Sequence, residues 1–204
     1  GDPKVVNRYT EDDKILEDGT RVPVYNDNDK TYLGTTTPPI YWNIRNEFTL
    51  WKDLTFSFSL YSYMGHKSLE GYYLNNDNGG SLMTYGFNTF KKDYWTPENQ
   101  NASSPRLIWT DPNRNARSES DRYLESGSYF RLRNLQVGYT LPTVWFHGFV
   151  QKARVYVNAE NLFTISSYSG YTPDVNSSDV YSRGFDEFIY PSNRTFMFGL
   201  NVTF

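Results

Sequence analysis

Apolar and polar residues alternate along the last ten residues of the chain, which read TFMFGLNVTF. The side chains of a β-strand point alternately to its two faces, so this stretch predicts a strand with one apolar and one mostly small or polar face. Ten residues is about the length of a tilted membrane strand, whereas strands of soluble proteins usually have about 5–6. The pattern therefore favours an outer-membrane barrel. The residues expected to face lipid are Phe196, Phe198, Leu200, Val202 and Phe204.

The same alternation predicts four strands upstream. The five predicted strands lie at about 40–51, 54–64, 124–141, 152–163 and 193–204. A tight turn at Lys52-Asp53 joins the first two into a β-hairpin. The phase of the third strand changes midway, which indicates a β-bulge or a portion of the strand above the membrane. In the fourth strand Arg154 and Glu160 lie opposite the apolar stripe, as expected for a wet lumen.

The connections between the predicted strands alternate between long and short. They divide the chain into a loop (1–39), a hairpin (40–64), a long loop (65–123) and three final strands with one turn and one loop (124–204). Bacterial barrels show this asymmetry, with short periplasmic turns and long extracellular loops. A C-terminus in the periplasm would place every long loop outside the cell.

The fold class predicted from these patterns is all-β, with five antiparallel strands. Five is an odd number and too few to close, because bacterial barrels have even counts of at least about eight. Open sheet edges would leave backbone groups unsatisfied in lipid. We therefore interpret the chain as the C-terminal piece of a larger transmembrane barrel, whose other strands lie in further sequence or in other chains.

Composition narrows the choice of function. The 20 basic and 23 acidic residues give a net charge of −3, which disfavours a nucleic-acid binder. Cysteine is absent and only two histidines are present, which leaves little for disulfides, zinc or histidine catalysis. No phosphate-binding glycine loop or nucleophile elbow occurs. We therefore do not expect an enzyme.

An ordered series of motifs runs along most of the chain. The motifs are LESGSYFRLRNLQVGYTLP at 124–142, VYVNAENLFT at 155–164, YSGYTPD at 168–174, YPSNRT at 190–195 and FGLNVTF at 198–204, with WTPEN at 95–99, Pro105-Arg106, DKTYLG at 29–34 and Gly1-Asp2 upstream. The series resembles the last third of SusC/RagA-type TonB-linked outer-membrane proteins. It departs from the family pattern at residues 5–23, where the family often has a more regular loop of Asp, Asn and Gly residues.

The resemblance implies a 22-stranded barrel with an N-terminal plug and a SusD-like surface lipoprotein as a lid. It also implies import of glycans or peptides energised through TonB. The plug and the TonB-contacting segment would lie N-terminal to this sequence. The implied partners are thus the SusD-like lipoprotein, the rest of the barrel and plug, TonB and outer-membrane lipid.

The candidate residues for contact with a substrate or with the lid are aromatic residues of the loops. The loop aromatics could stack on sugar rings, grip peptide or contact the lid, but such residues more often pack a loop against itself. They are Tyr72, Tyr73, Tyr85, Tyr94, Trp95 and Trp109. A short helix is also expected around 87–94.

Two groups of loop residues could bind Ca²⁺ through oxygen atoms. They are Asp12, Asp13 and Asp18, and Asp27, Asn28 and Asp29. Their spacing does not match an EF-hand loop, so solvated loop acids are the favoured interpretation and no cofactor is expected.

Two functions remain open from the sequence. One is a transporter barrel segment, and the other is a soluble, secreted all-β carbohydrate-binding module. The environment of the apolar stripes separates them, because a module would bury these stripes against a second sheet.

Overall fold

A computed structural model describes residues 5–71, 93–106, 108, 120–175, 182–187 and 189–204. These residues belong to two compact units. The first comprises Gly1–Gly34 and Gly71–Tyr123, and the second comprises Thr35–Glu70 and Leu124–Phe204. Within the described ranges, no helix is long and apolar enough to span a membrane.

The first unit contains little regular structure. Strands β1 (Lys14–Ile15) and β2 (Arg21–Val22) form a small antiparallel hairpin. Two 3-10 helices, η1 (Asp27–Asp29) and η2 (Asp121–Tyr123), also belong to this unit, and Asn26 caps η1 by accepting a hydrogen bond from the Asn28 backbone N–H. The helix expected around 87–94 lies mostly outside the described residues.

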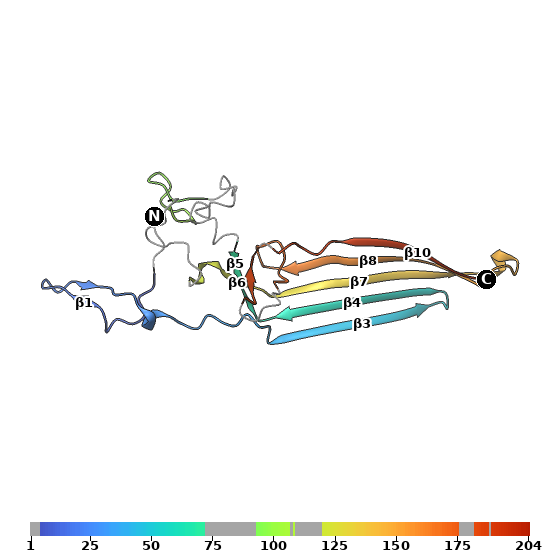
Figure 1. Ribbon diagram of the computed structural model, residues 1–204, viewed down its shortest axis with the longest axis horizontal. Helices are drawn as coiled ribbons and strands as arrows, with labels where there is room; N and C mark the ends of the chain where they lie inside the picture. The colour runs from blue at the N-terminus through green and yellow to red at the C-terminus, as the bar shows by residue number, and fades with distance from the viewer. Residues whose placement is uncertain (1–4, 72–92, 107, 109–119, 176–181, 188) are drawn as a thin grey trace. The chain divides into compact units, whose positions relative to one another are not determined.

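The second unit is built on a five-stranded sheet. Its strands are β3 (Ile40–Leu50), β4 (Leu54–Met64), β7 (Tyr129–Leu141), β8 (Lys152–Ser166) and β10 (Thr195–Thr203). They lie side by side in the order β10-β8-β7-β4-β3, and every neighbouring pair is antiparallel (Figure 1). The predicted all-β class with five antiparallel strands is thus confirmed.

A second, smaller sheet corrects part of the sequence interpretation. The strand expected over 124–141 is divided at Gly127, and its first part is a separate strand, β6 (Leu124–Ser126). Strand β6 pairs with β5 (Lys67–Glu70), which pairs in parallel with β9 (Phe185–Asp186). The two long connections of this unit were expected to be loops, but each contributes a strand to this sheet. We call it the loop sheet.

The register of the five strands places their apolar residues on one face. Phe198 pairs with Val157, Val157 with Val137, Val137 with Phe56 and Phe56 with Phe48. The predicted phase change in the third strand is a register shift, between Leu132 and Asn134 of β7. This β-bulge keeps Leu132 and Leu135 on the same face despite their odd separation. We call the two sides of this sheet the apolar face and the polar face.

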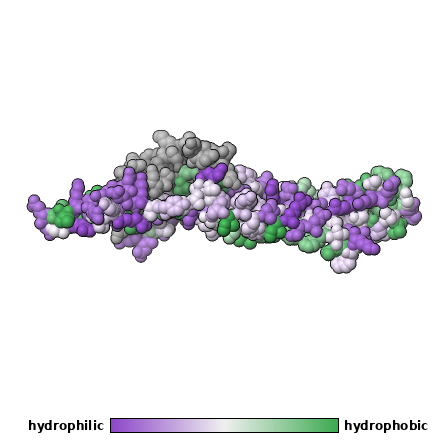
Figure 2. All heavy atoms as spheres, turned by 90° about the horizontal axis from the view of Figure 1, so that it is seen from below, coloured by the Kyte–Doolittle hydropathy of each residue, from purple (hydrophilic) through white to green (hydrophobic). Residues whose placement is uncertain are grey.

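The apolar face is exposed in this chain. Phe198 is 80% exposed, Leu200 62% and Val157 42%, far above the values of a packed core. Figure 2 shows apolar side chains at the surface of the strand-rich part of the molecule. A sandwich module would bury this face against a second sheet, and a large exposed apolar patch on a soluble protein is unusual. The arrangement instead fits a sheet that faces lipid.

The polar face is held together by side chains that cross neighbouring strands. The Arg154 Nη2 atom of β8 donates a 2.6 Å hydrogen bond to Thr55 Oγ1 of β4, passing over Gly138 of β7. Tyr156 lies in the same way across Gly199 of β10, where any Cβ atom would collide with its ring. Glycine is therefore needed at both positions, because a long side chain of a neighbouring strand occupies that space.

We expect Leu200→Arg to destabilise the folded protein in a bilayer by about 2–4 kcal/mol, because a lipid-facing arginine near the midplane carries that cost. The matched control is Met197→Arg on the polar face of the same strand. The measurement is the free energy of unfolding of the full-length protein in lipid vesicles. Equal losses from the two variants would contradict the assignment of the faces.

Candidate functional site

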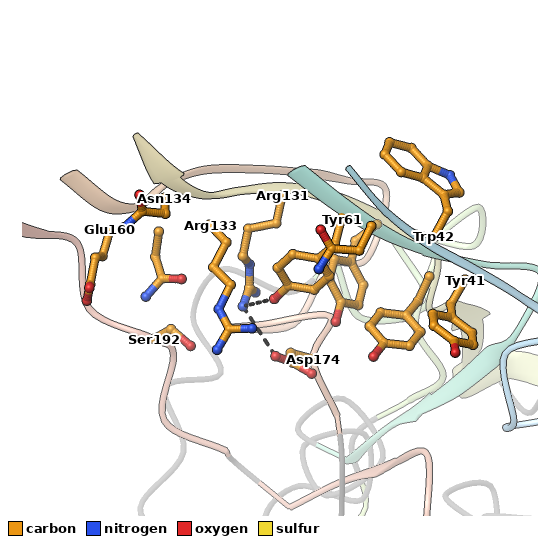
Figure 3. Close-up of a pocket in the computed structure, with 13 residues that line it drawn as sticks. Tyr41, Trp42, Tyr61, Arg131, Arg133, Asn134, Glu160, Asp174 and Ser192 are labelled. Atoms are coloured by element: carbon orange, nitrogen blue, oxygen red, sulfur yellow. Dashed lines mark hydrogen bonds and ion pairs between the residues drawn. The ribbon is translucent and has the colours of Figure 1, made fainter. Parts of the chain in front are cut away.

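A hollow of about 540 Å³ lies on the polar face, where β3, β4, β7 and β8 approach the long connections. Asp174 and Ser192, from the connection between β8 and β10, also line it. Its other lining residues are Tyr41, Trp42, Asn43, Tyr61, Tyr63, Tyr129, Arg131, Arg133, Asn134, Glu160 and Asn161. Figure 3 shows Arg131, Arg133 and Asp174 on one side of the sheet and Trp42 directed to the other. We call this hollow the polar-face pocket.

Arg131 is the most buried charged residue of the pocket, and it is only 4% exposed. Its Nε donates to Thr164 Oγ1 of β8 at 2.8 Å, and its Nη1 donates to the Tyr61 hydroxyl of β4 at 3.0 Å. The same Nη1 atom forms an ion pair with Asp174 Oδ2 at 3.2 Å (Figure 3). A buried charge is costly unless it is paired and hydrogen-bonded. Arg131 therefore joins β4 and β8 to the connection between β8 and β10, which carries Asp174.

Four tyrosines form one side of the pocket. Tyr41 and Tyr63 are stacked with ring centroids 5.9 Å apart, and Tyr61 meets Tyr129 edge-on at 5.8 Å. The Arg131 guanidinium lies 5.2 Å from the Tyr129 ring centroid, a cation-π distance. Such contacts fix the rings, so the pocket has a preformed aromatic side.

Irregular backbone forms the opposite side of the pocket. Arg133 has no paired residue on β4 or β8 because the register shifts there, and Arg133 and Asn134 both line the pocket. On β8, Asn161 has a positive φ of 50°, which is rare outside glycine. Its side-chain amide donates to the Asn193 carbonyl at 3.1 Å. Two adjacent strands thus depart from regular pairing at the pocket.

Several polar side chains contact or belong to the loop sheet, and some of them are buried. The Tyr168 hydroxyl donates to Asp186 Oδ2 at 2.8 Å, and burial together with this hydrogen bond raises the pKa of Tyr168. Burial lowers the pKa of His66. Glu125 accepts hydrogen bonds from the backbone N–H and hydroxyl of Ser169. These contacts join the loop sheet to the segment after β8, which is a scaffolding role.

The loop acids considered for Ca²⁺ accept hydrogen bonds from nitrogen donors. Asp29 accepts from the backbone N–H groups of Arg8 and Tyr9, and hydrogen bonds from Tyr9 and Asn26 lower its pKa. Asp12 accepts from the side-chain amides of Asn26 and Asn28. Among the described residues, no group of three or more His, Cys, Asp or Glu residues could hold a metal ion. The expectation of no cofactor, with calcium in these loops as the alternative, stays a prediction.

Most of the aromatic residues singled out from the sequence lie outside the described ranges. These are Tyr72, Tyr73, Tyr85 and Trp109. Tyr94 and Trp95 are half-buried in the first unit. The backbone N–H of Trp95 donates to the backbone carbonyl of Ser104 at 3.0 Å. Neither of them lines the polar-face pocket. A role for these six residues in substrate or lid contact stays a prediction.

The sequence alone did not identify the tyrosines of the pocket as candidate site residues. Their signal was present, because Tyr41, Tyr61 and Tyr63 all occupy polar-face positions of predicted strands. Nothing local in the sequence shows that strands β3, β4 and β7 bring them together.

No family model matches the chain, but individual proteins and solved structures do. The TonB-dependent receptor P3 of Formosa agariphila is 30% identical over 183 residues, covering 86% of this chain and 17% of the receptor. The TonB-dependent receptor SusC of Bacteroides thetaiotaomicron is 34% identical over 89 residues, 42% of this chain and 8% of SusC. The RagAB peptide importer in its open-open state matches with a TM-score of 0.70 and 26% identity, over 92% of this chain and 20% of that chain.

The sheet with its exposed apolar face and its polar face defines the class, a segment of an outer-membrane β-barrel. The chain belongs to the SusC/RagA-type TonB-dependent transporters, as its sequence and its fold both match members of that family. It spans less than a fifth of the length of the P3 receptor and of SusC.

We expect Asp174→Ala to release residues 172–175 from the five-stranded sheet, because it removes the acceptor of the charged hydrogen bond from Arg131. Such a bond contributes about 1.5–3 kcal/mol. The measurement is amide hydrogen exchange of this segment in the full-length protein, with Glu160→Gln as the control. Glu160 lines the same pocket but has no ion pair with another described residue. If the amide hydrogens of this segment exchange no faster in Asp174→Ala than in the parent protein, the ion pair does not hold the segment in place.

Proposed function

We propose that this chain is a wall segment of an outer-membrane importer that takes up glycans or peptides with a SusD-like lid lipoprotein and is energised by TonB. The observation that carries the proposal is the division of one sheet into an exposed apolar face and a polar face with a preformed pocket. Lipid on one side and an aqueous passage on the other account for both faces. The named relatives, two TonB-dependent receptors and a peptide importer, support this role.

The orientation follows from the connections. The turn between β3 and β4 and the connection between β7 and β8 are short, whereas the connections at the other end of the sheet are long. We place the long connections outside the cell and Phe204 in the periplasm, following the asymmetry of bacterial barrels. The polar-face pocket then lies at the extracellular end of the lumen, where an incoming substrate would arrive first.

The outer edges of β3 and β10 require further strands. Among the described residues, neither edge has a pairing partner. Each unpaired backbone group costs several kcal/mol in hydrocarbon, so bare edges are not stable in a bilayer. We place other strands of the same barrel on both edges and the plug inside the lumen.

The test of this function is uptake by cells that produce the full-length protein. We expect growth on the transported nutrient to require both this protein and TonB. Removing TonB should abolish growth on that nutrient while leaving growth on a small, porin-permeant sugar unchanged. Growth that persists without TonB would refute the proposed function.

We expect deletion of residues 72–119 from the full-length protein to weaken retention of the lid lipoprotein while leaving the barrel assembled. Loops of this length within a compact protein are usually functional. The measurement is co-purification of the lipoprotein from outer membranes. Shortening the turn between β7 and β8 is the control, because that turn lies at the opposite end of the sheet. Full co-purification after the loop deletion would contradict the proposed lid contact.

A further inference from the structure

We propose that the polar-face pocket is a ligand subsite in which Arg133 recognises a carboxylate of the transported molecule. The proposal rests on the proposed import function and identifies a specificity-determining residue within it. Neither the pocket nor Arg133 stood out in the sequence.

The first argument is that the backbone departs from a regular sheet at this place. A bulge in β7 puts Arg133 and Asn134 beside each other at the pocket, although consecutive residues of a regular strand point to opposite faces. Asn161 of β8 adopts the left-handed conformation beside it, a region that asparagine enters more readily than most non-glycine residues. Backbone irregularities cluster at ligand sites, and the residues that the bulge presents to this pocket are Arg133 and Asn134.

The second argument is the contrast between the two arginines of the pocket. Arg131 is buried, and its Nε and Nη1 atoms donate to Thr164, Tyr61 and Asp174. Arg133 is exposed on the same side of the sheet, and it forms no hydrogen bond or ion pair with another described side chain (Figure 3). Arg131 therefore stabilises the sheet, while no described side chain pairs with the guanidinium of Arg133.

The third argument is the chemistry around Arg133. A guanidinium presents a planar fork of N–H donors that matches the two oxygens of a carboxylate. Ser192 and Asn134 line the same part of the pocket, and the Ser192 hydroxyl and the second N–H of the Asn134 amide, whose first N–H donates to Asn158, can donate further hydrogen bonds. Glu160 also lines it, so the attraction of Arg133 for a carboxylate must exceed the repulsion from Glu160. These side chains together suit one isolated carboxylate.

The remainder of the pocket suits the uncharged part of such a molecule. Its volume of about 540 Å³ is in the usual range for small-molecule sites, about 300–1,000 Å³. The tyrosine side supplies rings and hydroxyl groups next to the guanidinium. Two sources share this chemistry, the carboxylate of a uronic acid in an oligosaccharide and the C-terminal carboxylate of a short peptide.

The test is isothermal titration calorimetry with the purified full-length transporter. Four probes distinguish the sources: a trisaccharide with a single terminal glucuronic acid and the methyl ester of that trisaccharide, and a tetrapeptide of alanine with a free or an amidated C-terminus. We expect at least one free acid to bind more tightly than its neutral form. Arg133→Ala should weaken binding of that acid about tenfold or more, because a charged hydrogen bond is lost. Arg133→Lys should restore part of the affinity, since it keeps the charge without the fork.

The matched control is Arg45→Ala, which removes an exposed polar-face arginine of β3 that does not line the pocket. The affinity of Arg45→Ala for the acid should stay within about twofold of the affinity of the parent protein. The proposal is overturned if no free acid binds, if acid and neutral forms bind equally, or if Arg133→Ala binds the acid as the parent does. Because calorimetry does not involve TonB, these outcomes are separate from the uptake test, which can succeed while Arg133 proves irrelevant.

Discussion

The register of the five strands is the constraint on which the rest of this structure depends. Side chains alternate between the two faces of a strand, so a slip of one residue would exchange the apolar face for the polar face. The row of paired residues Phe198, Val157, Val137, Phe56 and Phe48 has one member on each strand, so all five strands keep the same phase. Only this common phase lets one side of the sheet face lipid while the other carries charged and hydroxyl groups.

The bulge in β7 both preserves that register and locally breaks it. Without the irregularity at Leu132 and Asn134, the apolar residues of the two halves of the strand would lie on opposite faces. The same irregularity leaves Arg133 without a paired residue on either neighbouring strand and brings it to the pocket beside Asn134. One backbone feature thus shapes both the apolar face and the polar face of the sheet.

Arg131 gives the pocket its shape. Its hydrogen bonds reach β4, β8 and the segment that carries Asp174, and its guanidinium packs against the tyrosine rings. A charge that is 4% exposed needs all of these partners, since burying an unpaired ion is strongly unfavourable. The connection after β8 is consequently tied to the sheet, and the polar side of the barrel wall has a fixed concave surface there.

The sequence by itself determined the five strands, their faces and the phase change in β7, because a period of two residues is a local property that can be read along the chain. It did not reveal β5, β6 and β9, since two- to four-residue strands are too short to show a period. Nor did it reveal the pocket, which joins Tyr41, Arg133 and Asp174 from distant parts of the chain. Their proximity follows from strand order, from register and from the Arg131 ion pair, which exist only once the chain has folded.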